Sequence, residues 1–152
     1  MLRSSCSDLL QTGLVRVAVI GVGRMGRAIV KRLRAAGHAV AAYDVTSGPG
    51  RAPSLAAAAA GTSLVFFSLP DEAAVRSAAA ELVEVDQPPP LLVDLTSSLR
   101  STTRQVAEQL ARRDIAMLDV PLSGGVAGAQ EGRLTAMVGG DPGGWSTPTC
   151  AA

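Results

Sequence analysis

Three glycines and one aspartate form the most specific chemical pattern in the sequence. Gly21, Gly23 and Gly26 directly follow an apolar run, and Asp44 comes 18 residues after Gly26. Where such glycines join a strand to a helix, the first permits a tight turn and the second lets the backbone approach a pyrophosphate. The third lets the helix pack close to the strand. An ordinary strand-to-helix turn is the alternative, but an acidic residue ending the next strand favours a dinucleotide site.

The segment GVGRMG predicts how the phosphates are held. A helix that begins inside it offers free N–H groups and the positive end of its dipole, so Val22, Arg24 and Met25 join the three glycines as predicted cofactor-binding residues. The Asp44 carboxylate can hold a ribose diol and would repel a 2′-phosphate, which favours NAD over NADP. Arg51 is close enough in sequence to meet a 2′-phosphate, or else it is a solvated loop residue.

Composition excludes several other classes of protein. The chain has 152 residues, a net charge of +1 and 3% aromatic residues, which gives no case for nucleic acid binding. One histidine and two cysteines in polar tails cannot form a usual zinc site or a disulfide framework. No apolar run approaches the roughly 20 residues of a membrane span, and no signal peptide is evident. A cytoplasmic protein without a membrane partner is predicted.

Strand and helix patterns alternate along the chain. Apolar runs predict strands at 14–20, 38–43, 63–70, 91–95, 115–120 and 134–138, and helical periodicity predicts helices at about 24–36, 54–60, 71–85 and 102–113. This alternation predicts an α/β fold of the Rossmann type, with a doubly wound, mostly parallel sheet. Residues 1–13 are expected to be a flexible segment, 14–140 a dinucleotide-binding domain and 141–152 a disordered tail.

Four separated blocks resemble the β-hydroxyacid dehydrogenase family, which includes 3-hydroxyisobutyrate, tartronate semialdehyde and 6-phosphogluconate dehydrogenases. The blocks are GVGRMG at 21–26, SLPDEAAV at 68–75, DLTS at 94–97 and DVPLSGGVAGAQEGRLTAMVGG at 119–140. They occur in the family's order and cover its N-terminal cofactor domain. The resemblance implies an oxidoreductase that moves a hydride between a small 3-hydroxy acid and a nicotinamide cofactor.

The resemblance also implies roles for residues at strand ends. Leu69 and Pro70 resemble the pair that contacts the ribose side of the cofactor, and Thr96 and Ser97 resemble hydroxyl residues near the nicotinamide. Ligands of parallel sheets bind outside the carboxyl ends of the strands, which suits both pairs. Without the resemblance, Thr96 and Ser97 would be taken simply to end a strand.

A further block resembles the family's substrate-carboxylate segment. Ser123, Gly124 and Gly125 can offer a hydroxyl and unobstructed backbone amides to an anion, or they can form only a turn. Asp94 and Asp119 end strands and are interpreted as hydrogen-bonded structural acids rather than catalytic residues.

The chain departs from the family pattern after Asp44. Only ten positions separate Asp44 from Ser54, where the family inserts a further helix and strand. The third strand of the order 3-2-1-4-5-6 is therefore expected to be missing, together with its helix. Its loss would expose the second strand as an edge and weaken cofactor binding.

In the family, the general base is a lysine within a glycine-containing Lys–Asn motif, on a helix beyond the cofactor domain. No such motif occurs in this sequence. Lys31 is the single lysine, on the first helix, so no catalytic residue is predicted in this chain. The family's C-terminal helical domain is also expected to be absent, and the apolar surface that would meet it is expected to favour self-association.

Three functions follow from these patterns. The first is the NAD(P)-binding domain of a 3-hydroxy acid dehydrogenase with little activity alone. The second is a non-catalytic module that binds a dinucleotide or a partner. The third is a related imine reductase, against which the Ser123–Gly124–Gly125 block argues.

Overall fold

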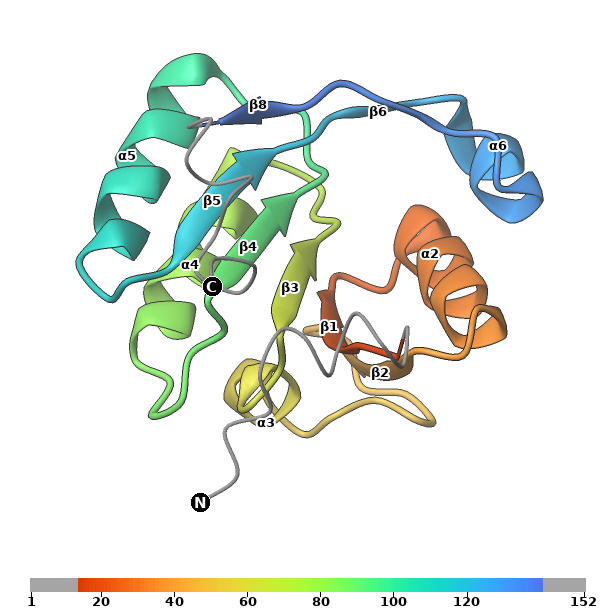
Figure 1. Cartoon of the computed structure of the whole chain (residues 1–152), viewed down its shortest axis with the longest axis horizontal. Helices are drawn as coiled ribbons and strands as arrows, with labels where there is room; N and C mark the ends of the chain where they lie inside the picture. Colours follow the sequence, from red (N-terminus) through yellow and green to blue (C-terminus); the bar gives the residue numbers. More distant parts are fainter. Residues whose placement is uncertain (1–13, 141–152) are drawn as a thin grey trace.

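The fold is built around one mostly parallel sheet. The computed structural model describes residues 14–140 of the chain, so the predicted flexible segment 1–13 and disordered tail 141–152 lie outside the described residues. Six strands form the main sheet in the order β2-β1-β3-β4-β5-β8 (Figure 1). The Rossmann-type prediction is confirmed, because the first five strands are parallel and their order is the expected one without its outermost strand.

The elements agree with the predicted ones to within about three residues at most ends. The strands of the main sheet are β1 Arg16–Ile20, β2 Ala39–Tyr43, β3 Leu64–Phe67, β4 Leu91–Asp94, β5 Ala116–Asp119 and β8 Gly139–Gly140. The helices between the parallel strands are α2 Arg24–Ala35, α3 Leu55–Ala59, α4 Glu72–Val83 and α5 Arg100–Ala111.

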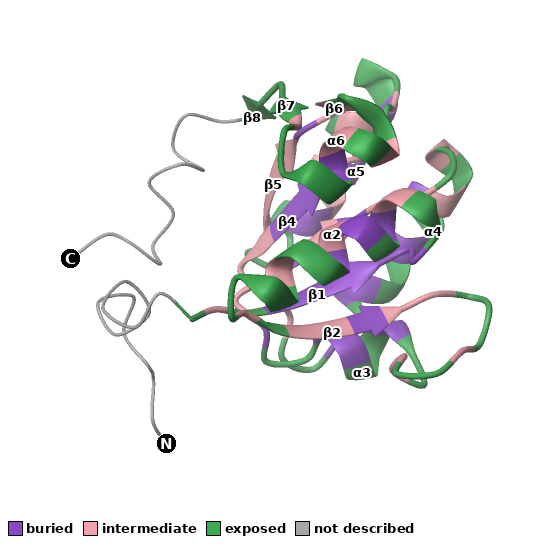
Figure 2. Ribbon diagram, turned by 90° about the vertical axis from the view of Figure 1, so that its right-hand side faces the viewer, coloured by how far each residue is buried: buried purple, intermediate pink, exposed green. Residues whose placement is uncertain are grey.

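Side chains alternate between the two faces of the sheet. Ala18 and Ile20 of β1 belong to the core under α3, α4 and α5, whereas Val19 belongs to a smaller core under α2. On β3, Phe67 enters the larger core and Phe66 packs against the smaller one. The buried residues follow the strands and the inner faces of the helices (Figure 2). The sheet is thus covered on both faces near β1, where the glycine turn lies.

Side-chain caps begin α3 and α4, and a glycine ends α2. The side chains of Ser54 and Asp71 accept hydrogen bonds from backbone N–H groups three residues later, at 3.0 Å and 2.8 Å. At the end of α2, Gly37 adopts a φ of +92°, and the His38 N–H donates to the Leu33 carbonyl at 3.1 Å. This left-handed closure turns the chain back toward β2, as the glycine predicted.

The glycine-rich segment after β5 differs from the prediction. In place of a single strand at 134–138 it forms β6 Leu122–Ser123, helix α6 Gly125–Glu131, and β7 Thr135–Ala136, followed by β8. Strands β6 and β7 pair with each other, and β8 pairs antiparallel with β5. Helix α6 was not predicted because glycines at both ends and in its middle obscure helical periodicity. It packs against α2 (Figure 1).

The short loop after β2 partly covers the sheet edge that the sequence analysis predicts to be exposed. Strand β2 is the outermost strand among the described residues. The loop 45–53 runs back along it, however, and the Ala52 N–H donates to the Ala42 carbonyl at 2.7 Å. Part of the free edge is therefore paired by the loop itself, which limits pairing with other chains.

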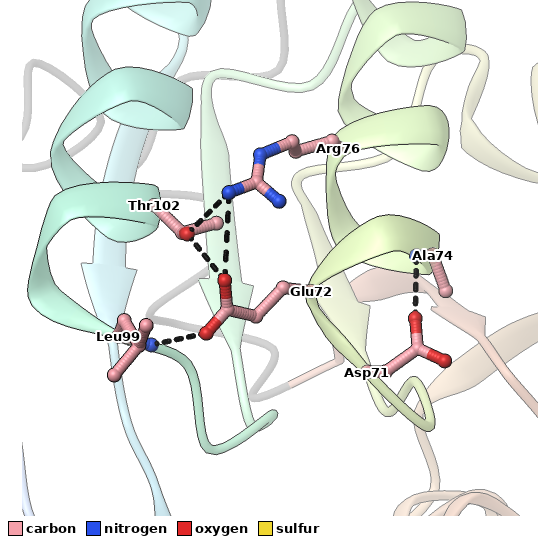
Figure 3. A network of polar contacts seen from close by, with 6 residues as sticks. All are labelled: Asp71, Glu72, Ala74, Arg76, Leu99 and Thr102. Carbon is pink, nitrogen blue, oxygen red and sulfur yellow. Dashed lines mark hydrogen bonds and ion pairs between the residues drawn. The ribbon is translucent and has the colours of Figure 1, made fainter.

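One polar network joins α4 to the start of α5 (Figure 3). The Leu99 N–H donates to Glu72 Oε1 at 2.9 Å, and the buried Thr102 hydroxyl donates to Glu72 Oε2 at 2.6 Å. Arg76 Nη2 donates to the Thr102 hydroxyl at 2.7 Å and lies 3.4 Å from Glu72 Oε2. Because α5 has no side-chain cap of its own, Glu72 supplies one from the neighbouring helix.

Replacing Glu72 by glutamine should destabilise the fold in a pH-dependent way. Hydrogen bonds from Thr102, then Leu99, and the Arg76 charge hold the pKa of Glu72 below its usual 4.5. A lowered carboxyl pKa stabilises the native state above the unfolded-state pKa, and this contribution is lost as pH falls through the native value. We expect a lower urea midpoint for Glu72→Gln at pH 7 and a much smaller difference at pH 3.

The exposed glutamate Glu108 on α5 provides the matched control. Glu108→Gln should leave the urea midpoint unchanged at both pH values. An equal destabilisation by Glu72→Gln at pH 7 and pH 3 would contradict a role for the ionised carboxylate.

Candidate dinucleotide site

The turn between β1 and α2 is built from two backbone contacts that only glycine permits. Gly21 has a φ of +92°, and a Cβ at this position would overlap the Ser68 carbonyl oxygen. A Cβ at Gly26 would overlap the carbonyl oxygen of Gly21. The Gly21 N–H donates to the Tyr43 carbonyl at 2.9 Å, which ties the turn to β2. The first and third glycines of the pattern are therefore required by packing within the chain.

Gly23 has a different environment. It lies immediately before α2 with an ordinary φ of −69°, and no atom lies within 4 Å of the position that a Cβ would occupy. The chain itself thus leaves space above this residue. The first turn of α2 has neither a side-chain cap nor an acidic residue, so its N–H groups and dipole face that space uncompensated by a side chain.

Asp44 lies at the end of β2 with its carboxylate directed at the turn. Its Oδ2 accepts a hydrogen bond from the Val22 N–H at 2.6 Å, and its Oδ1 accepts from the Thr46 N–H and hydroxyl at 3.0 Å and 2.6 Å. Burial by itself raises the pKa of Asp44, but these hydrogen bonds and the Arg51 charge outweigh it and hold the pKa below 3.8. The carboxylate is therefore ionised at neutral pH beside the glycine turn.

A cavity of about 660 Å³ opens between this turn, the end of β3 and one face of α4. Most of the predicted cofactor residues line it: Gly21, Gly23, Arg24, Met25, Gly26, Asp44, Leu69 and Pro70. A cavity of this size is within the range of small-molecule and cofactor sites. No part of the described chain fills it, and the glycine turn and Asp44 share its wall.

Other predicted residues lie outside this cavity. Val22 is buried beneath it and contributes its N–H to Asp44. Thr96 is also buried, and its hydroxyl accepts a hydrogen bond from the Leu69 N–H at 3.1 Å, while Ser97 is exposed. Thr96 thus holds the backbone of a wall residue.

The predicted carboxylate segment lies at the junction of β6 and α6. Ser123 is exposed at the end of β6, and Gly124 and Gly125 have left-handed φ values of +119° and +61°. No atom lies within 4 Å of a Cβ built on Gly125. Val126, the next residue, lines the large cavity, so this segment adjoins its rim.

The sequence patterns missed the contribution of α4. Four of its residues line the cavity at helical spacing: Ala74, Ser77, Ala78 and Glu81. The missed lining residues outside α4 are Ile20, Tyr43, Val45, Leu55, Ser68 and Val126. Ala74, Ser77 and Ala78 are small residues at positions i, i+3 and i+4 of α4. This spacing could have predicted the wall, because a helix face that meets a ligand needs small side chains.

Two acids end neighbouring strands behind the site. Asp94 and Asp119 are register partners on β4 and β5. Asp94 Oδ1 accepts from the Thr96 N–H at 2.9 Å, but Asp94 Oδ2 and Asp119 Oδ1 are buried without a hydrogen-bond partner among the described residues. Burial raises the pKa of both, and the nearby Asp119 charge raises that of Asp94 further. For Asp94, the bond to Thr96 agrees with a structural role.

The chain matches a known family. A family model described as the NAD binding domain of 6-phosphogluconate dehydrogenase matches residues 16–149. The chain belongs to this family. The predicted resemblance is confirmed, and the chain is an NAD-binding domain of the oxidoreductase type. Within residues 14–140, no helix is long and apolar enough to cross a bilayer.

Named relatives are similar over most of this chain. The probable 3-hydroxyisobutyrate dehydrogenase-like 2 of Arabidopsis thaliana, named as mitochondrial, is 34% identical over 88% of this chain and 48% of its own length. The 3-hydroxyisobutyrate dehydrogenase of Pseudomonas aeruginosa is 34% identical over 82% of this chain and 46% of its own. The chain spans about half the length of the curated relatives it matches.

A solved structure gives the same result for the fold. The 3-hydroxyisobutyrate dehydrogenase of Mycobacterium tuberculosis, determined with L-serine, superimposes with a TM-score of 0.82 at 28% identity. The match covers 90% of this chain and 51% of that one.

Removing the unpaired carboxyl oxygen of Asp94 should stabilise the protein. A raised carboxyl pKa means that the native state binds more protons than the unfolded state, so stability falls as pH rises from about 3.8 through the native pKa. An asparagine at this position would not titrate, and its amide can donate toward Asp119. We expect Asp94→Asn to raise the free energy of unfolding at pH 7 by about 1–3 kcal/mol, the cost of one unpaired buried polar group.

The measurement is urea unfolding from pH 3 to pH 8. The gain should vanish near pH 3, where the aspartate is protonated in both states. A loss of stability at pH 7 would show that the ionised carboxylate is stabilising, contrary to this account.

Proposed function

We propose that residues 14–140 form the dinucleotide-binding domain of an NAD(P)-dependent 3-hydroxy acid dehydrogenase, and that this chain alone binds the cofactor without efficient turnover. The single observation that carries the proposal is the open space above Gly23 between the bare start of α2 and the Asp44 carboxylate. Two phosphates and a ribose require a site of this kind.

Each end of the cofactor has a proposed position. The pyrophosphate contacts the turn at Gly23 and Arg24, while the Val22 N–H holds the Asp44 carboxylate, to which a hydroxyl of the adenosine ribose donates. Leu69 and Pro70 contact the other ribose at the end of β3. Thr96 and Ser97 lie beyond them, toward the nicotinamide, where Thr96 acts by fixing the Leu69 backbone.

The substrate is a small hydroxy acid whose carboxylate meets Ser123, Gly124 and Gly125. The left-handed glycines support this, because backbone in such conformations can present N–H groups to an anion without side-chain obstruction. Val126 lines the large cavity, which supports a position of this segment beside the proposed cofactor site.

Hydride transfer from a hydroxy acid also requires a base for the hydroxyl proton. Lys31 is the single lysine of the sequence, and it is exposed in the middle of α2 and does not line the large cavity. The family resemblance assigns the role of general base to none of the residues that line the large cavity. The loss of general base assistance is worth typically about 10²–10⁴-fold in rate.

Self-association is part of the same proposal. Leu99, Met137 and Val138 are 66%, 55% and 42% exposed, and such exposed apolar side chains support association with a second copy of the chain. A non-catalytic module that binds a dinucleotide is the second candidate function. The glycine turn and Asp44 favour it, because they can hold a dinucleotide without a catalytic residue.

Cofactor binding is tested by titration with NADH, followed through its fluorescence. Wild-type protein should bind saturably, and Gly23→Ala should abolish binding, because a methyl group would occupy the space proposed for the pyrophosphate. Circular dichroism melting should show Gly23→Ala folded with little change, since its Cβ meets nothing in the chain.

Gly26→Ala is the matched glycine variant. Its Cβ overlaps backbone, so it should lower the melting temperature strongly. Unchanged NADH binding by folded Gly23→Ala would contradict the proposed position of the phosphates.

The second test is an assay of NADH formation with 3-hydroxyisobutyrate and with L-serine at pH 7–9. The chain alone should show no turnover above the uncatalysed rate while still binding NADH. Turnover that survives Lys31→Ala would contradict the assignment of the missing base. Saturable binding with no turnover is the expected pair of results.

A further inference from the structure

Two carboxyl groups end neighbouring strands on the same face of the sheet. Asp94 ends β4 and Asp119 ends β5, and they are register partners, as are Leu92 and Met117 two residues earlier. Leu92 lies in the larger core and Met117 packs against it, so the alternation of side chains directs both aspartates to that face as well. Paired strands lie about 4.8 Å apart, which places the two carboxyl groups side by side.

Each carboxyl group has one buried oxygen without a hydrogen-bond donor. Asp94 is fully buried, and its Oδ1 accepts from the Thr96 N–H, but its Oδ2 has no partner among the described residues. The same holds for Oδ1 of Asp119. Two ionised carboxylates in contact would also repel each other. One proton between Asp94 Oδ2 and Asp119 Oδ1 resolves both problems, because one oxygen then donates and the other accepts.

No basic group of the packed elements takes the place of this proton within residues 14–140, where none of the ion pairs includes Asp94 or Asp119. Strands β3 and β8, which flank β4 and β5, contain no titratable side chain. The charged residues of α4 and α5 are Glu72, Arg76 and Glu81, and Arg100, Arg104 and Glu108. Glu72 and Arg76 pair with each other, and the other four are exposed. Burial raises the pKa of both aspartates, which agrees with a retained proton.

We propose that Asp94 and Asp119 share one proton at neutral pH and act as positioning residues for the two segments that follow β4 and β5. The pair then carries a single negative charge. The segment after β4 contains Thr96, whose hydroxyl holds the Leu69 backbone in the wall of the large cavity. The segment after β5 begins with Val120, whose N–H donates to the Asp94 carbonyl at 2.7 Å. The positioning role rests on the proposed cofactor function, whereas the shared proton does not.

Loss of the proton at alkaline pH leaves two ionised carboxylates at adjacent strand ends. Their repulsion acts where the pairing of β4 with β5 ends, so both following segments should become less firmly held. The alternative is that each oxygen is satisfied separately. Buried water could do this, as could the hydroxyls of Ser98 and Thr103, which are also buried without a partner among the described residues.

The first experiment is infrared spectroscopy of the full chain in D₂O at neutral pH, where a protonated carboxyl group has a C=O band distinct from that of a carboxylate. Wild type should show this band. Asp94→Asn and Asp119→Asn should each lack it, because the asparagine amide donates in place of the proton. Glu108→Gln, at an exposed position of α5, is the control and should keep the band. No band in wild type, or a band that persists in either asparagine variant, would overturn the shared proton.

Urea unfolding from pH 5 to pH 8 tests the same pair through proton linkage. The native wild type should bind about one proton more than the unfolded state until the pair ionises, so its stability should fall as pH rises. Either single asparagine variant should remove this fall completely, and the double variant should be no more stable than the single ones. If each single variant removed only part of the fall and the parts added up, the two carboxyl groups would be independent and the pair overturned.

The positioning role is tested by NADH titration from pH 6 to pH 9. Wild type should bind about fivefold more weakly, or weaker still, once the pair has lost its proton, whereas Asp94→Asn should bind equally across the range. The same pH dependence in both proteins would overturn the positioning role. Wild type that binds no NADH at any pH would overturn the proposed function and the positioning role with it, while the infrared and urea results decide the shared proton separately.

Discussion

The backbone contact between Gly21 and Gly26 is the constraint on which the site depends. It brings the first turn of α2 against the end of β1, with the Gly21 carbonyl occupying the space of a side chain at Gly26. Only in this arrangement do the N–H groups at the start of α2 face outward beside Asp44. The contact needs no ligand, so the site is formed by the same packing that forms the fold.

The opposite wall depends on hydrogen bonds from other strands. Thr96 holds the Leu69 backbone through its hydroxyl, and Asp94 in turn accepts from the Thr96 N–H. The Glu72 network then fixes the start of α5, just after this segment. These bonds link the ends of β3 and β4, so polar contacts add to the core packing of Leu69 in holding this wall. The buried Asp94 thus supports this wall by fixing the Thr96 backbone.

Patterns in the sequence predicted the features that arise from local chemistry. The caps at Ser54 and Asp71, the left-handed Gly37 and the parallel order of strands all follow from residue type and spacing. Helix α6 could not be predicted, because its stability comes from packing on α2 rather than from its glycine-rich sequence. The Glu72–Thr102 contact joins residues 30 positions apart, and no periodicity indicates such a pair.

The short connection after β2 illustrates how a missing element alters chemistry as well as shape. A loop of nine residues cannot cover the sheet edge with a strand, yet the Ala52 N–H pairs with β2 and directs the preceding residues over Asp44. The side chain of Arg51 is consequently brought to the carboxylate that, in the sequence pattern, favours NAD over NADP. Because the loop turns back along the edge, it places a cation beside Asp44. The way the sheet edge is closed thus sets the charge around Asp44, because the loop that pairs with β2 also carries Arg51.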